Sequence, residues 1–132
     1  MVTAAAQAHA QGFGSVEEQM VFQELLRRGL KHGQDFTYQN RFFGGRLDKG
    51  GLIVDFLFSN PPDLAINVTG FYFHYQQGVE QLAQDRYAII QLAQQGITLV
   101  EIDDTDIHQD VKYFVGEALK YRDHSLRARG MV

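Results

Sequence analysis

Cysteine is absent from the 132-residue sequence, and so is tryptophan. Without cysteine the chain can form neither a disulfide framework nor a thiolate zinc site, as is typical of proteins in a reducing compartment. No apolar run approaches the roughly 20 residues that a membrane-spanning helix needs. The first twelve residues also lack the basic stretch and apolar core of a secretory signal. We therefore expect a cytoplasmic protein without a membrane partner.

An excess of positive charge is also missing. The chain has 12 Lys and Arg against 16 Asp and Glu, which gives a net charge of -4. This balance argues against broad, non-specific binding of nucleic acid. A local basic cluster is formed by Arg41, Arg46 and Lys49, in and beside a glycine-rich turn. It can contact phosphates, or it can simply keep the turn solvated.

Two apolar runs of strand length lie at the centre of the chain, at 52–58 and 64–68. Asn60, Pro61 and Pro62 separate them, which predicts an antiparallel hairpin. Apolar periodicity and capping signals predict the other elements: helices at 15–28, 78–95 and 107–121, and strands at 35–43 and 97–102. A strand–helix–strand crossover after the hairpin predicts a mixed four-stranded sheet flanked by helices, an α/β fold.

The predicted domain covers residues 15–121. Residues 1–14 are small and polar, and we expect an N-terminal arm outside the core. Residues 122–132 form a C-terminal tail. Three acids, Asp103, Asp104 and Asp106, follow the last strand, but they lack the spacing and terminal Glu of a calcium loop. Capping of the last helix by Asp104 or Asp106 is the prediction there.

Polar residues interrupt the apolar hairpin. Asp55 lies within the first run, and a buried charge is costly unless it is paired or bound to a metal. Asn67 and Thr69 follow in the second run, and His74 comes after three aromatic residues. Asn67 can instead be a hydrogen-bonded buried amide, and His74 an ordinary histidine among aromatics. The pattern is typical of a site built on two neighbouring strands.

Glu18 has two interpretations. It aligns with the apolar stripe of the first helix, three residues before Val21 and seven before Leu25, so it can point inward. It also stands three residues after Ser15 and can complete a capping box at the start of the helix. The two roles exclude each other only in part.

In this order the motifs resemble the PD-(D/E)XK nucleases, closest to the small branch that includes very-short-patch repair endonucleases and related phage and homing nucleases. The resemblance covers roughly Ser15 to Leu119 and implies a restriction-endonuclease-like fold. It rests on a helix with an inward Glu and then on these motifs: Gly44-Gly45, Val54-Asp55-Phe56, Gly70-x-x-x-His74, Asp85-Arg86 and Gly96-x-x-Leu99-Val100-Glu101-Ile102-Asp103.

The resemblance implies a Mg²⁺ or Mn²⁺ site that hydrolyses phosphodiester bonds in DNA. It assigns Asp55 and Glu18 as metal-side acids, a backbone carbonyl at Val68 as a further ligand, and His74 as an acid–base or phosphate contact. The chain departs from the family where acid-x-Lys or acid-x-Gln is usual, because Asn67 and Thr69 stand there. The candidate catalytic residues are therefore Glu18, Asp55, Asn67, Thr69 and His74.

Two functions are compatible with these residues. The first is a metal-dependent DNA endonuclease. The second is a catalytically inactive nuclease fold that serves as an assembly subunit, with protein partners in a phage particle or nucleoprotein complex. Asn67, Thr69 and the acidic net charge motivate the second, and a phage-encoded protein of that kind would reside in the virion.

Overall fold

The structure is a computed structural model that describes residues 3–42, 52–70 and 79–130. Within these residues, no helix is long and apolar enough to cross a membrane. The elements follow in the order α1 (Ala4–Ala10), α2 (Val16–Arg27), β1 (Phe36–Phe42), β2 (Leu52–Phe58), β3 (Leu64–Thr69), α4 (Val79–Gln94), β4 (Thr98–Asp103) and α5 (Asp104–Ala118).

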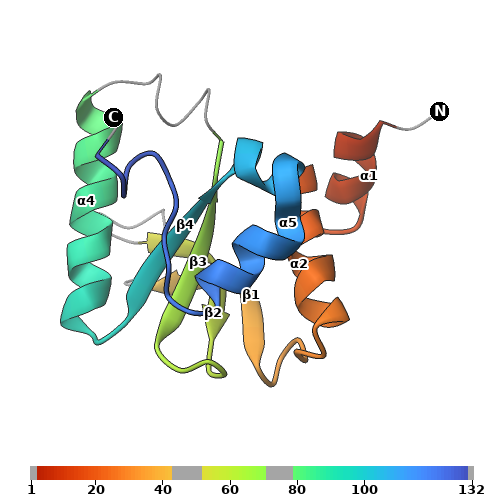
Figure 1. Ribbon diagram of the computed structural model, residues 1–132, viewed down its shortest axis with the longest axis horizontal. Helices are drawn as coiled ribbons and strands as arrows, with labels where there is room; N and C mark the ends of the chain where they lie inside the picture. The colour runs from red at the N-terminus through yellow and green to blue at the C-terminus, as the bar shows by residue number, and fades with distance from the viewer. Residues whose placement is uncertain (1–2, 43–51, 71–78, 131–132) are drawn as a thin grey trace.

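The four strands form one mixed sheet in the order β1-β2-β3-β4 (Figure 1). β2 pairs antiparallel with both β1 and β3, whereas β3 and β4 are parallel because α4 carries the chain across between them. The predicted α/β fold, a mixed four-stranded sheet flanked by helices, is confirmed. The predicted central hairpin corresponds to β2 and β3.

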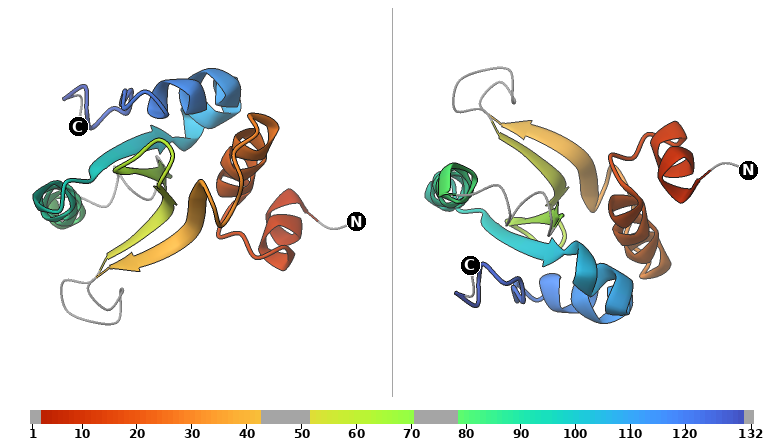
Figure 2. Two further views of the ribbon diagram at one scale, coloured as in Figure 1. Left: turned by 90° about the horizontal axis from the view of Figure 1, so that it is seen from below. Right: turned by 90° about the horizontal axis from the view of Figure 1, so that it is seen from above.

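Both faces of the sheet are covered. Helices α2 and α5 lie on one side and α4 on the other (Figure 2). The first side holds the larger core, which includes the fully buried side chains of Phe56, Ile66 and Leu25. The second side holds a smaller cluster in which Leu92 of α4 meets Val54 and other strand residues. Burial on both faces explains why the strands read as nearly continuous apolar runs.

Local signals place the start of α2 and the ends of α2 and α4 where the sequence predicts them. The Ser15 side chain accepts a hydrogen bond from the Glu18 amide at 3.1 Å and caps α2. Gly29 follows α2 with φ of 87°, and Gly96 follows α4 with φ of 79°. Side chains other than glycine rarely adopt this left-handed conformation, so both positions end their helices.

The segment expected as an arm contains helix α1 and contacts the rest of the fold. Ala8 of α1 is fully buried. Phe13 packs against the rings of Phe22 and Tyr38, with centroids 5.1 Å and 5.4 Å away. Ring contacts of this kind stabilise the position of α1 beside α2 and β1.

The start of α5 differs from the prediction. The helix begins at Asp104, and Asp103 takes the N-cap position without a capping bond from its side chain. The prediction that Asp104 or Asp106 caps this helix is therefore wrong. The Asp103 carboxylate instead accepts the Leu126 amide of the C-terminal tail.

Asp110 interrupts helix α5 with extended backbone. Its carboxylate accepts the Tyr113 amide at 3.0 Å, and this bond caps the second half of the helix.

Candidate active site

A fork between β2 and β3 begins at Asp55. The main-chain pairing of the two strands runs from Phe58↔Leu64 to Phe56↔Ile66 and then stops. Beyond it, side chains replace the ladder. The Asp55 amide donates to Asn67 Oδ1 at 2.8 Å, and the Val68 amide donates to Asp55 Oδ2 at 2.8 Å. The Asp55 carboxylate is therefore placed directly against the main chain of Val68.

The backbone is irregular at this point. Side chains two residues apart on a strand share a face, yet Val54 belongs to the cluster under α4 and Phe56 to the core under α2 and α5. On the other side of β2, Gln39 has φ of 57°, and the β1–β2 pairing passes from Tyr38↔Phe56 to Asn40↔Val54 without a Gln39–Asp55 pair. Irregular strands next to one another often mark functional sites, because they redirect side chains.

A polar row crosses the sheet at this level. Asp55 faces Asn67, and Asn67 is the direct partner of Glu101 on β4. Two residues further along, Thr69 partners Asp103. Thr69, Glu101 and Asp103 are all buried, and the Thr69 hydroxyl lies 3.5 Å from Glu101 Oε2. The polar row is defined here as Asp55, Asn67, Thr69, Glu101 and Asp103.

Glu101 and Asp103 were not among the candidates drawn from the sequence. A signal for them exists: two acids occupy alternate positions of a short apolar strand, which puts them on one face. Their proximity to Asn67 and Thr69 depends on the register of two strands about thirty residues apart, which no local pattern specifies.

Glu18 combines both of its expected roles. Its Oε2 accepts the Ser15 hydroxyl at 3.1 Å at the start of α2. Its Oε1 accepts the Tyr38 hydroxyl at 2.6 Å, so the side chain also reaches inward to β1. The pKa of Tyr38 is raised above its ordinary value, first by burial, then by the hydrogen bond to Glu18, and also by the negative charge of Asp55. The negative charges of Glu18 and Asp55 therefore both act on Tyr38.

Replacing Tyr38 by Phe is expected to lower the free energy of unfolding by about 1–2 kcal/mol, because the Gly14 amide loses its acceptor and Glu18 Oε1 loses Tyr38 as a donor. The difference in unfolding free energy between wild type and Tyr38→Phe should become smaller above about pH 10. At that pH tyrosine ionises in the unfolded chain, while Tyr38 in the folded protein stays protonated. Stability from Tyr38 is thus complete below that pH and is lost as the pH rises.

Urea denaturation of both proteins near pH 7 and near pH 11 measures this effect. Tyr87→Phe is the control, since Tyr87 is 58% exposed. If the unfolding free energies of wild type and Tyr38→Phe differ by the same amount at both pH values, the raised pKa of Tyr38 is contradicted.

The donor set at the fork suits a sparsely coordinated Mg²⁺. No group of three or more His, Cys, Asp or Glu that could hold a metal occurs among residues 3–42, 52–70 and 79–130. Mg²⁺, however, commonly takes one or two carboxylates and keeps its waters. Asp55 is half-buried, and the N–H and C=O of a strand residue point to the same side, so the Val68 carbonyl is also directed toward β2.

The remaining candidates are less clearly placed for a metal. Both Glu18 oxygens accept hydrogen bonds, and the Asn67 oxygen accepts the Asp55 amide. His74 lies outside the residues that the structure describes. Metal binding by Asp55, Glu18 and Val68 stays a prediction, as do the catalytic roles of Asn67, Thr69 and His74.

Comparison of the chain with protein-family models, with curated proteins and with solved structures found no match in any of the three.

Proposed function

We propose that this chain is a restriction-endonuclease-like protein that hydrolyses phosphodiester bonds in DNA with Mg²⁺ or Mn²⁺. The observation that carries the proposal is the placement of Asp55 at the β2–β3 fork, with its carboxylate 2.8 Å from the Val68 amide. The resemblance of the sequence to PD-(D/E)XK nucleases implies these two residues as metal ligands. The order of elements, with three antiparallel strands between two helices and then a parallel strand, also supports it.

Asp55 and the Val68 carbonyl would hold the cation. A divalent cation supplies activation of water and neutralises charge on the scissile phosphate. The Val68 amide orients the Asp55 carboxylate, and the Asn67 oxygen fixes the Asp55 backbone. His74 is the proposed proton carrier or phosphate contact. Glu18 accepts the Tyr38 hydroxyl and so joins helix α2 to β1.

Nicking of supercoiled plasmid tests the proposal. Wild-type protein is expected to convert the plasmid to the open circle with Mg²⁺ or Mn²⁺ and to lose this activity in EDTA. Absence of nicking with both metals, by protein that calorimetry shows to be folded, would overturn the endonuclease assignment.

A second candidate function is an inactive nuclease fold that acts as an assembly subunit in a phage particle or nucleoprotein complex. It is favoured by the contacts that occupy the Asn67 oxygen and both Glu18 oxygens. It is also favoured by Tyr87 and Ile90, which lie one helical turn apart on α4 and are 58% and 55% exposed. The protein would then reside in the virion, whereas the enzyme would act in the cytoplasm.

Nicking by the wild-type protein distinguishes the two functions, and Asn67→Glu tests whether the fork can hold a metal. The substitution adds a carboxylate beside Asp55 and is expected to increase Mn²⁺ affinity by about tenfold or more in either case. If the protein is an inactive scaffold, the wild type does not nick plasmid, whereas a wild-type enzyme does. Isothermal titration with Mn²⁺ measures the affinity, and Asn67→Gln, which adds length without charge, is the matched control.

A further inference from the structure

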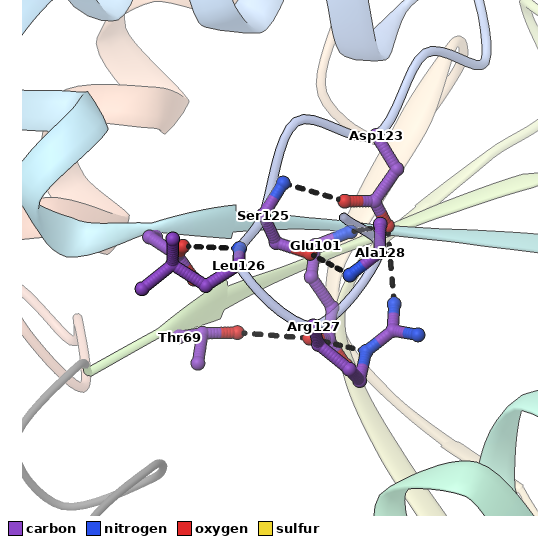
Figure 3. Close-up of polar contacts among 8 residues, drawn as sticks. Thr69, Glu101, Asp123, Ser125, Leu126, Arg127 and Ala128 are labelled. Atoms are coloured by element: carbon purple, nitrogen blue, oxygen red, sulfur yellow. Dashed lines mark hydrogen bonds and ion pairs between the residues drawn. The ribbon is translucent and has the colours of Figure 1, made fainter. Parts of the chain in front are cut away.

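The C-terminal tail is bound to β4 at the level of the polar row (Figure 3). The Asp123 carboxylate accepts the Glu101 amide at 3.0 Å, and the Leu126 amide donates to Asp103 at 3.0 Å. Ser125 is fully buried between them. Since β4 is the last strand of the described sheet, the tail satisfies a main-chain donor that would otherwise form part of an exposed edge.

Arg127 adds ion pairs to these contacts. Its Nε lies 2.9 Å from Glu101 Oε2, and its Nη2 lies 3.1 Å from the Asp123 carboxylate. The Glu101 side chain is only 4% exposed and that of Arg127 15%. Burying a carboxylate to this degree is costly unless it is paired and hydrogen-bonded, and Arg127 of the tail supplies a cationic partner for Glu101.

The contact continues from Glu101 to the candidate site. The same oxygen, Glu101 Oε2, is 3.5 Å from the Thr69 hydroxyl on β3. Thr69 follows Val68, and Glu101 is the direct strand partner of Asn67. A chain of polar groups therefore runs from the tail, through Glu101, to the end of β3 that forms one side of the fork.

We propose that Arg127 is a positioning residue for the candidate active site, which it serves through Glu101 by fixing the end of β3 opposite Asp55. The catalytic part of this inference rests on the proposed nuclease function. Loss of Arg127 removes the cationic group that holds Glu101 Oε2, so the Glu101 side chain is expected to shift and to release the Thr69 hydroxyl. A displacement of about 1 Å at a reacting group costs about 100-fold in rate.

The test compares Arg127→Met and Arg127→Lys with the double variant Glu101→Gln/Arg127→Met. The double variant removes both charges of the Glu101–Arg127 pair, so its melting temperature is expected to return close to that of wild type. Its nicking rate is expected to stay about 100-fold low, because the bond from Arg127 to the side chain at position 101 is still missing. Arg127→Lys keeps the charge and should recover part of the rate. Arg122→Met is the control, since Arg122 lies in the same tail but is 61% exposed and pairs with Glu117.

A double variant that melts and nicks like wild type would overturn the positioning role.

A second readout separates this inference from the proposed function. If wild type does not nick, the nuclease proposal fails, and the amide NMR resonances of Val68 and Thr69 decide the role of Arg127. They are expected to shift in the double variant and not in Arg122→Met, and unchanged resonances in both would overturn the inference.

Discussion

Asp55→Asn is expected to reduce metal-dependent nicking by at least about 100-fold while the protein stays folded. This size of the effect follows from metal sites in general. Loss even of a residue that only supports a metal ligand lowers metal affinity or activity about 10–100-fold. Asparagine keeps an oxygen that can accept the Val68 amide, so the fork is preserved, but it removes the negative charge that a hard cation requires. Plasmid nicking with Mg²⁺ and thermal melting measure the two expectations separately.

Asp55→Ala removes the acceptor as well. It is expected to abolish nicking and to lower the free energy of unfolding by about 1–3 kcal/mol, since the Val68 amide loses its partner. Asp63→Asn is the matched control, because it makes the same charge change at an exposed turn residue of the same hairpin. Nicking that survives Asp55→Asn would place the activity elsewhere and contradict the site.

Phe56→Ala is expected to lower the free energy of unfolding by about 3–5 kcal/mol. Phe56 is fully buried in the core between the sheet and helices α2 and α5. Its ring lies 5.2 Å from that of Tyr38 and 6.2 Å from that of Phe36, so truncation leaves a cavity lined by aromatic rings that cannot readily close. Urea denaturation measures the change.

Tyr87→Ala removes a ring of similar size from an exposed position on α4. Its expected effect is within about 0.5 kcal/mol, as for most surface substitutions. A cost below about 1 kcal/mol for Phe56→Ala would mean that β2 does not anchor the core, and the fork at Asp55 would then lose its structural basis.

Much of the fold could be predicted because it depends on local signals. Apolar runs, the Ser15 cap and the glycines after α2 and α4 predicted the elements to within a few residues, and their order predicted a mixed sheet. Helix α1 was missed because a short alanine-rich segment shows no periodic apolar face. The start of α5 was misplaced because the Asp103 carboxylate binds the tail rather than the helix.

The candidate site was predicted only in part. Asp55 stood out in the sequence as a charge inside an apolar strand, and the structure places it against Asn67 and Val68. The link from Glu18 through Tyr38 required the packing of α2 on β1.

The sequence by itself determined the strands, the helices other than α1 and the presence of polar groups on two neighbouring strands, because periodicity and capping act between residues close in the chain. Only the tertiary structure decided which of these polar groups meet. The parallel register of β3 and β4 brings Glu101 beside Asn67, and the return of the tail brings Arg127 to Glu101. Both contacts depend on long-range packing. The register of the strands determines which residues are neighbours, and a buried carboxylate is stable only when it is paired.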